Sequence, residues 1–466
     1  MGGRNAGHRT NLQSVSGGTG GRGAYDGRMS PDEMERLLAL LRIPSISALP
    51  EHRPDMMRAA TAMADEVRRA GGDAAIHGTV AHPFVVGEVP PSDGRPDPAR
   101  VLIYGHYDVQ PVGDLDRWES PPFEPEFRGE HLYARGASDD KGNLFQAIVA
   151  VQRLAAQRRL PVHVTFLIDG EEETSGTSAI DWVNALDEVP DVGVIWDGGM
   201  IARGKPSVET GVRGLCYRRV TVTTGRLDGH SGLYGGAALN AAHALTRVLA
   251  AVQPVDGRLP DALYAGVGAV SDAERTAWAQ MPAGDRMLEE AGLRPADARA
   301  GEEFATRTLA SPSVDVHAIW CGDADAVKTV IPSIARAMVS VRVAPGQDPA
   351  VIGPALDRLL RGAAPAGATV EVENLGDASP ALMDPDHPVM RTAAAAIARA
   401  TGAAVTPVRT GGTLPIFATM VARMPTVLTG FALPDDAIHS PNERILVENL
   451  GTGVRAGMAM LEAFAR

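Results

Sequence analysis

The sequence has an excess of negative charge, few cysteines and no long apolar run. With 44 Lys and Arg against 57 Asp and Glu, its net charge is −13, which would repel a phosphate backbone and argues against nucleic acid as a partner. Cys216 and Cys321 are its only cysteines, too few for a disulfide framework or a thiolate zinc site, and they suit a reducing cytoplasm. No apolar run reaches the ~20 residues of a membrane span, so we expect no membrane association.

The N-terminal segment also lacks something, the apolar core of a signal peptide. Residues 1–29 are rich in Gly, Ser and Arg, and we predict that they form a disordered tail; the alternative is that Met29 is the true start. From Ser30 the chain offers an N-cap, a proline at the first helical position and the glutamate of a capping box. The chain of 466 residues is too long for one ordinary core, so two domains are expected.

Strand and helix signals alternate over residues 30–214. Strands are predicted at residues 101–104, 162–168 and 192–196, and a helix at 141–157. The same alternation of strands and helices returns over residues 381–466, with a helix at 389–401, a strand at 425–429 and a final helix. This alternation predicts a layered α/β domain, made of both segments, in which helices flank a sheet.

The middle of the chain has another pattern. Residues 334–343 predict a strand in which every second residue from Ala335 to Val343 is apolar and shares one face. Strands are also predicted at 217–223 and 369–373, and helices at 237–252 and 348–360. The stretch 253–312 is rich in Pro, Gly and Asp and is expected to be irregular. We predict that residues 215–380 form a small α+β domain inserted into the first.

Polar clusters follow the predicted strands or precede helices. His106 and Asp108 come two residues apart after a buried strand, so they can face one site, and open α/β sheets bind ligands beyond the carboxyl ends of their strands. The other clusters are the segment 136–142 with Asp139 and Asp140, the run 169–173, Asp197-Gly198, and the segment 437–443. Each alone has an ordinary explanation, such as a helix cap, a solvated turn or a structural histidine.

Taken together, these clusters indicate a metal site. Consecutive carboxylates after a buried strand must be solvated, paired or bound to cations, because unpaired buried charges are costly. Histidines with several carboxylates and no thiolate suit zinc, manganese or cobalt. More carboxylates than one ion needs suggest a two-metal site with a shared carboxylate and a bridging water, whose proton a non-ligating glutamate can take.

The polar strings themselves carry a resemblance to a known family. They are Gly-His-Tyr-Asp-Val-Gln-Pro around His106, Ala-Ser-Asp-Asp-Lys-Gly around Asp139, Asp-Gly-Glu-Glu-Glu ending at Glu173, His-Ser-Gly-Leu-Tyr-Gly-Gly from His230 and His-Ser-Pro-Asn-Glu from His439. In this order they resemble the two-zinc peptidases of the aminoacylase and carnosine-dipeptidase family, and within it the cytosolic non-specific dipeptidases. The resemblance runs from about Ser30 to the C-terminus.

That resemblance implies a fold and a metal centre. The fold would be a zinc-peptidase type catalytic domain, with a mixed twisted sheet flanked by helices, and an inserted α+β domain that serves as a lid and makes a homodimer. Two divalent ions would be bound, with Zn²⁺ the first choice and Mn²⁺ or Co²⁺ the alternatives. The implied ligands are His106 and Asp197 for one ion, Glu173 and His439 for the other, and Asp139 for both. Asp108 would accept a hydrogen bond from the far nitrogen of His106, and the Asp139–Asp140 peptide would be cis.

The glutamate run needs one decision about register. The family has Gly two residues after its metal-binding Glu, whereas here Gly176 comes three residues after Glu173. Counting back from Gly176 places Thr174 at the metal, which is chemically poor. Counting forward from the preceding strand makes Glu172 the general base and Glu173 the ligand, with one extra residue in the turn. Glu171 is the remaining alternative for these roles.

Further residues are implied at the substrate. His230 would reach the active site of the partner subunit and stabilise the oxyanion, although from the residues alone it reads as a surface residue at a helix start. Arg342 would grip the substrate carboxylate, assisted by Thr329. Gly412 and Thr413 lie in a string that resembles the loop lining the substrate end.

The function predicted from the sequence is therefore hydrolysis of dipeptides by a water activated at a dinuclear metal site, with Glu172 as general base. The nearest alternative is an N-acyl-amino-acid deacylase, which uses the same chemistry on a different acyl group. A non-catalytic relative that binds peptides would be expected to lack the base or a ligand. A plain metal-binding scaffold would need neither His230 nor Arg342.

Overall fold

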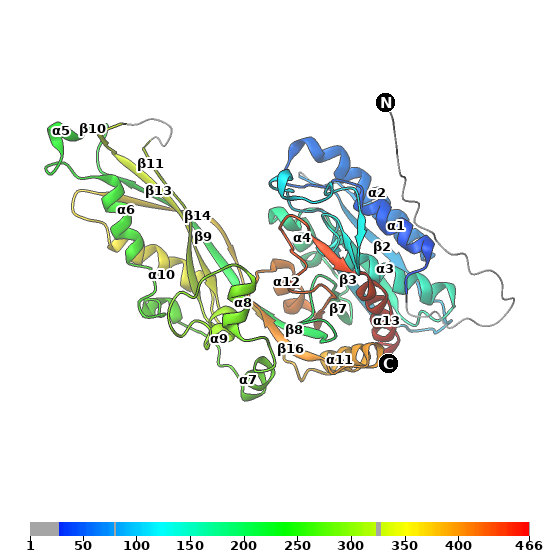
Figure 1. Cartoon of the computed structure of the whole chain (residues 1–466). Coiled ribbons are helices and arrows are strands. Elements are labelled where there is room, and N and C mark those ends of the chain that lie inside the picture. Colours follow the sequence, from blue (N-terminus) through cyan, green and yellow to red (C-terminus); the bar gives the residue numbers. More distant parts are fainter. Residues whose placement is uncertain (1–27, 79–80, 323–327, 466) are drawn as a thin grey trace, which may run out of the picture.

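The computed structural model describes residues 28–78, 81–322 and 328–465 and shows a larger and a smaller lobe (Figure 1). The predicted tail lies almost wholly outside the described residues. Helix α1 (Pro31–Leu41) begins as predicted, because the Ser30 hydroxyl accepts a hydrogen bond from the Glu33 N–H and the Glu33 carboxylate accepts one from the Ser30 N–H. This reciprocal cap fixes the start of the first ordered element.

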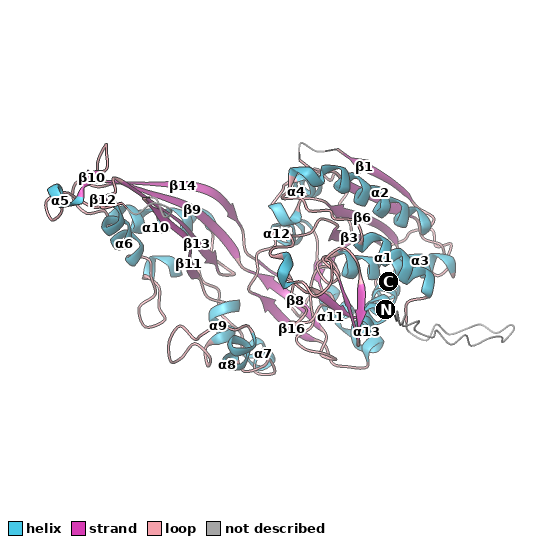
Figure 2. Ribbon diagram, turned by 45° about the horizontal axis from the view of Figure 1, so that its top comes forward, coloured by secondary structure: helices cyan, strands magenta, loops and turns pink. Residues whose placement is uncertain are grey.

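A nine-stranded mixed sheet forms the centre of the larger lobe, in the order β1-β2-β6-β3-β7-β17-β8-β15, with β16 paired to β8 (Figure 2). Its strands are β1 (Asp73–His77), β2 (Phe84–Val89), β3 (Arg100–His106), β6 (His163–Asp169), β7 (Val192–Ile195), β8 (Ser207–Val212), β15 (Ala381–Leu382), β16 (Thr406–Thr410) and β17 (Thr426–Leu428). The central strand β3 is parallel to both β6 and β7. Parallel strands covered on both faces are continuously apolar, which is why these strands could be predicted from the sequence.

Helices pack along this sheet and complete its core. They are α2 (Arg53–Arg69), α3 (Lys141–Ala156), α4 (Ser178–Asn184), α11 (Pro388–Thr401), α12 (Pro415–Arg423) and α13 (Val447–Ala463). The buried residues of this core come from 37–212 and again from 381–464, so the C-terminal segment returns to the larger lobe. The mixed sheet and its helices confirm the predicted fold class. No helix in the described ranges is both long and apolar enough for a membrane span.

The smaller lobe has an antiparallel sheet and a core of its own. The sheet order is β11-β13-β9-β14, with strands β9 (Gly214–Thr223), β11 (Ser313–Cys321), β13 (Ile334–Val343) and β14 (Thr369–Ala378). Helices α6 (Ala241–Ala250) and α10 (Pro349–Gly362) pack against it, and their apolar residues join those of the sheet in a second core. At the far end, β10 (Gly229–His230) pairs with β12 (Val330–Ile331) next to α5 (Ser231–Tyr234).

Two sequence expectations for the smaller lobe were wrong. The stretch 253–312 is not irregular but contains η4 (Asp261–Tyr264), α7 (Asp272–Trp278), α8 (Gly284–Glu290) and α9 (Phe304–Leu309). The Pro and Gly content favoured an irregular structure, but Ser271 and Glu274 form a capping box that starts α7. The helix predicted from residue 237 begins only at Ala241, because the Asn240 side chain accepts hydrogen bonds from the N–H groups of Ala242 and His243.

Candidate metal centre

The predicted cluster residues meet beyond the carboxyl ends of three neighbouring strands. His106 ends β3, Asp197 follows β7 after one residue, and Glu172 and Glu173 begin the short turn η3 (Glu172–Thr174) after β6. Because β3 is parallel to both of its neighbours, these strand ends lie on the same edge of the sheet, where open α/β sheets bind ligands. Two loops bring Asp139 and His439 to the same place.

Asp139 lies between the two histidines. One carboxylate oxygen, Oδ1, is 3.0 Å from Nε2 of His106, and the other, Oδ2, is 2.8 Å from Nε2 of His439. Nε2 of His106 is also 3.7 Å from Oδ1 of Asp197, and Nε2 of His439 is 3.4 Å from Oε2 of Glu173. The five residues predicted as ligands therefore converge on one centre, with Asp139 in the shared position.

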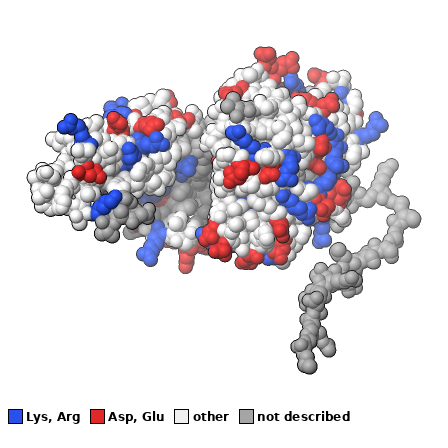
Figure 3. All heavy atoms as spheres, turned by 90° about the horizontal axis from the view of Figure 1, so that it is seen from above, with Lys and Arg blue, Asp and Glu red and all other residues white. Residues whose placement is uncertain are grey.

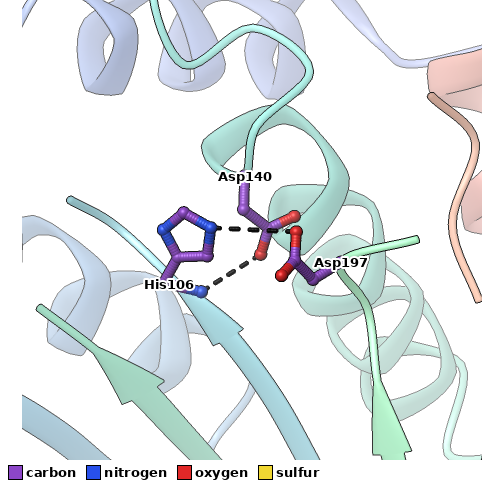
Figure 4. A group of neighbouring side chains, drawn as sticks. All are labelled: His106, Asp140 and Asp197. Atoms are coloured by element: carbon purple, nitrogen blue, oxygen red, sulfur yellow. Dashed lines mark hydrogen bonds and ion pairs between the residues drawn. The ribbon is translucent and has the colours of Figure 1, made fainter. Parts of the chain in front are cut away.

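Asp140 also faces this centre, which the sequence analysis did not predict. Figure 4 shows it with His106 and Asp197. A ring nitrogen of His106 and one oxygen of each carboxylate lie close enough to one another to bind the same metal ion. Its Oδ2 accepts a hydrogen bond of 3.1 Å from the His106 N–H, whereas its buried Oδ1 has no hydrogen-bond partner among the described residues. Burial and the neighbouring Asp197 raise the pKa of Asp140 well above its usual value. Asp139 is nearer to His106 Nε2 and also reaches His439, which favours Asp139 over Asp140 for the shared position.

His106 is held from behind by Asp108. Nδ1 of His106 lies 3.1 Å from the main-chain oxygen of Asp108 and 3.3 Å from its Oδ1. The other oxygen of this fully buried carboxylate accepts a hydrogen bond from the Glu173 N–H at 3.1 Å. Asp108 thus orients residues on both sides of the centre, leaving Nε2 of His106 free to face it. Gln110, which sequence reasoning missed, donates to Glu173 Oε2 at 2.7 Å.

The three consecutive glutamates point in different directions. The carboxylate of Glu171 turns inward, where it accepts hydrogen bonds from the His82 N–H at 2.9 Å and the Ser178 hydroxyl at 2.7 Å. Glu173 faces His439, and Glu172 lines a cavity beside the centre. Burial, reinforced by Asp197 and Glu173, raises the pKa of Glu172 well above its usual value. Glu172 and Glu173 therefore face the centre and its cavity, whereas Glu171 does not; their roles stay a prediction.

Glu443 organises the loop that presents Asp139, and its importance was also missed in the sequence. Its fully buried carboxylate accepts hydrogen bonds of 3.0 Å from the N–H groups of Gly136, Ser138 and Asp139, and one of 2.7 Å from the guanidinium of Arg135. The Asp139–Asp140 peptide in this loop is cis, as the resemblance implied. The string His-Ser-Pro-Asn-Glu therefore contributes both to the centre and to the support of the residue opposite.

The donor set fits divalent cations. Two imidazoles and several carboxylates converge without a thiolate, a combination that suits zinc, manganese or cobalt. Among the described residues, no Lys or Arg lines the cavity at this centre. The carboxylates face the two histidines instead and raise the pKa of both, that of His439 to about 10. Burial raises the pKa of Asp197, because a charge is unfavourable where water is excluded.

The cavity has a volume of about 350 Å³. Gly412 and Thr413 line it, together with Glu172, Asp197 and His439. Arg342 on β13 donates a hydrogen bond of 2.6 Å to the Thr413 hydroxyl, so this residue of the smaller lobe does come to the edge of the cavity.

Two predicted residues are not brought to the centre within one chain. His230 and Thr329 lie at the far end of the smaller lobe, where β10 and α5 are remote from β3 and β7 in Figure 1. There the Ser231 hydroxyl donates to the Thr329 carbonyl at 2.8 Å, and Nδ1 of His230 accepts from the Gly232 N–H at 3.0 Å. Within the chain His230 thus caps α5.

Comparisons with known proteins agree with this centre. A cysteinylglycine-S-conjugate dipeptidase of Corynebacterium striatum is 28% identical over 424 residues, which cover 88% of this chain and 90% of the relative. Human carnosine dipeptidase 1 shares the fold at 25% identity with a TM-score of 0.78, over 93% of this chain and 96% of that chain. An M20 family metallo-carboxypeptidase from Sulfolobus solfataricus does so at 25% identity with a TM-score of 0.82, over 94% and 100%.

The family itself is shown by a match over most of the chain. The model of peptidase family M20/M25/M40 matches residues 102–463, which include every residue assigned to the centre above. This match confirms the resemblance found in the polar strings. The chain is a member of peptidase family M20/M25/M40.

Proposed function

We propose that this chain is a metal-dependent dipeptidase that uses two divalent ions. The observation that carries the proposal is the position of Asp139 between His106 and His439, beside a cavity lined by Glu172. The cavity, at about 350 Å³, is at the small end of the range for small-molecule sites. Relatives named as dipeptidases for cysteinylglycine conjugates and carnosine support a substrate of this size.

The ligands would divide between the two ions around Asp139. His106 and Asp197 would hold one ion, Glu173 and His439 the other, and Asp139 both. When bound, such ions polarise a carbonyl oxygen and lower the pKa of a water molecule, which is the chemistry that peptide hydrolysis needs. Zn²⁺ is our first choice, with Mn²⁺ and Co²⁺ as alternatives.

The other residues of the cavity would move protons and hold the substrate. No described residue donates a hydrogen bond to the Glu172 carboxylate. It can therefore take a proton from the attacking water and return it to the leaving amine. Arg342, next to Thr413, would bind the free carboxylate of the substrate, because a guanidinium can donate two parallel hydrogen bonds to it.

Removal of divalent ions is expected to abolish the activity. After dialysis against a chelator, hydrolysis of a panel of Xaa-Xaa dipeptides should fall to background, and Zn²⁺, Mn²⁺ or Co²⁺ should restore it, because the clustered carboxylates alone cannot activate water. Metal analysis should give about two ions per chain in the active protein. Full activity after chelation, with no ion bound, would contradict the proposal.

The alternative function, deacylation of N-acyl amino acids, is separated by substrate. Ala-Ala and N-acetylalanine would be assayed side by side at equal concentrations with the same metal-loaded protein. The dipeptidase is expected to hydrolyse Ala-Ala with the higher kcat/KM. Turnover of N-acetylalanine without any dipeptide hydrolysis would instead support a deacylase.

We further propose that the larger lobe is the catalytic domain and that the smaller lobe makes a homodimer. Strand β11 is an exposed edge of its sheet, and the exposed fractions of Ile319 and Trp320 on it are 58% and 41%. A long apolar edge strand is a template for pairing with another chain. The end of the smaller lobe near β10 and α5 also exposes Leu227 and Leu233, by 85% and 74%. The face of that end seen in Figure 3 carries few charged side chains.

A dimer would also explain why His230 lies far from its own chain's centre. From this end of the smaller lobe it could enter the cavity of a partner subunit and donate a hydrogen bond to the oxyanion. Removal of one such donor lowers kcat by about 10²–10³-fold.

Mixed dimers test this arrangement. The variants His230→Ala and Glu172→Gln are each expected to be nearly inactive, but their co-expression should recover about a quarter of wild-type activity. About half of the dimers would be mixed, and a mixed dimer contains one site of two with both native residues. The matched control places both substitutions in one chain and co-expresses it with either single variant, which should recover nothing. A fully active monomer in sedimentation experiments would contradict the shared site.

A cytoplasmic location stays a proposal from the sequence. It is supported by the two cysteines, Cys216 and Cys321, which are both free in the structure. Thiols of this kind suit a reducing compartment.

A further inference from the structure

Glu209 is a carboxylate in the cavity wall for which the mechanism above has no use. It lies on β8, where it is the one residue of six that is not buried. Its side chain lines the same cavity as Glu172 and Asp197. The partial exposure of Glu209 is therefore exposure to the space that a substrate would occupy.

The protein gives this carboxylate little compensation. Oε1 accepts a hydrogen bond of 3.2 Å from the Gly199 N–H, and no Lys or Arg among the described residues lines the cavity around it. Burial raises the pKa of Glu209 to about 7. A carboxylate placed in this way is stabilised by a cation that comes from outside the protein.

Glu209 is also separate from the metal centre. Neither of the two groups of ligand atoms found among the described residues includes it. The backbone next to it is shaped to admit the carboxylate, since a Cβ added to Gly198 would lie 2.8 Å from Oε1 of Glu209. Glycine at this position lets the carboxylate approach the main chain directly after Asp197.

A positive charge lies beside the cavity, next to Thr413. The strand containing Glu209 leads to Gly214, whose carbonyl accepts a hydrogen bond of 3.2 Å from Thr413, the residue to which Arg342 donates. Five residues separate Glu209 from Gly214, so their Cα atoms are at most about 17 Å apart, against about 7 Å for an extended dipeptide. Glutamate and arginine side chains are long enough to make up the difference, so a carboxylate and a guanidinium would face the two ends of one small substrate.

We propose that Glu209 binds the free α-amino group of the substrate and thereby selects unblocked dipeptides over N-acyl amino acids. This inference rests on the proposed function and deepens it. The ammonium group would lie at the Glu209 end, the scissile bond at the metal centre and the carboxylate at the Arg342 end. Glu209 would act as a specificity-determining residue, since it takes no part in the bond that breaks.

Binding of two ligands that differ only in the amine tests the proposal. Ala-Ala and propionyl-alanine, which replaces the amino group by hydrogen, would be titrated by calorimetry into metal-loaded Glu172→Gln protein, so that the ligands persist. Ala-Ala is expected to bind about 10- to 100-fold more tightly. Adding Glu209→Gln should reduce this ratio to about one, while the amide oxygen still accepts from Gly199. The control Glu51→Gln, at an exposed glutamate of the same lobe, should leave the ratio unchanged.

Each result has one meaning for Glu209. A ratio that survives Glu209→Gln overturns the proposal, and so does an equal loss of affinity for both ligands, which would show a role in cavity shape. In the active protein, Glu209→Gln should raise KM for Ala-Ala and change kcat little. If the wild type hydrolyses no dipeptide but the binding ratio still collapses, the proposed function fails and the assignment of Glu209 stands.

Discussion

Replacement of Glu172 by glutamine is expected to lower kcat for dipeptide hydrolysis by about 10⁴-fold, at the upper end of what a general base contributes. Glutamine keeps the size of the side chain but cannot take a proton from water. The residues assigned as ligands, among them Asp139 and Glu173, are unchanged. Metal analysis should therefore find the same number of ions in the variant as in the wild type.

The neighbouring glutamate provides the control for this result. Glu171→Gln puts an amide where two donors, the His82 N–H and the Ser178 hydroxyl, now meet a carboxylate. Its main effect should therefore be a lower melting temperature and not a lower kcat. Stopped-flow or endpoint assays and thermal unfolding of both variants separate the two effects. Substantial turnover by Glu172→Gln, or selective loss of kcat in a stable Glu171→Gln protein, would overturn the assignment of the base.

Replacement of Glu443 by glutamine is expected to lower the free energy of unfolding by about 3–5 kcal/mol, the usual effect of removing one partner of a buried ion pair. Arg135, which is 1% exposed, would keep a charge without its counter-charge. The amide NH₂ of glutamine would also face N–H groups of the loop, and neither donor would have an acceptor. Because these N–H groups include that of Asp139, metal affinity should fall by about 10- to 100-fold as well.

Two further variants make this prediction specific. Glu448→Gln, at an exposed glutamate of α13, should change the free energy of unfolding by less than about 1 kcal/mol. Replacing both partners, with Arg135→Met and Glu443→Leu, should recover part of the stability, since neither member of this ion pair then remains buried without the other, but not the metal affinity. Chemical denaturation and competitive metal titration measure the two quantities. Unchanged metal affinity in a destabilised Glu443→Gln protein would show that the loop does not depend on this carboxylate.

The meeting of the polar clusters at one edge of the sheet was largely predictable, because their residues follow local rules. β3, β6 and β7 are buried on both faces and therefore read as apolar runs, and the residues after parallel strands share one edge of a sheet. The sequence alone thus places His106, Asp197 and Glu173 together. The register of the glutamate run, with Glu172 as base and Glu173 as ligand, stays a prediction.

Other features depended on contacts that no local pattern encodes. Glu443 meets Asp139 across 304 residues of sequence, and a glutamate after a turn looks the same whether it faces solvent or a buried loop. Glu209 reads as an ordinary polar position in a strand, because only the packing around β8 shows which side the cavity is on. The short helices between residues 253 and 312 were missed because their caps lie within a Pro- and Gly-rich stretch.

The position of β17 has a consequence for how the protein is made. In the finished sheet β17 lies between β7 and β8, although it follows β7 by about 230 residues in the chain. At the usual speed of translation, roughly 10 to 50 s pass between the synthesis of the two strands. During that time the smaller lobe has been completed, while the sheet has a gap at its middle and His439 has not yet been made. A nascent chain that does not yet include His439 thus lacks one of the residues proposed as metal ligands, and we expect it to be inactive.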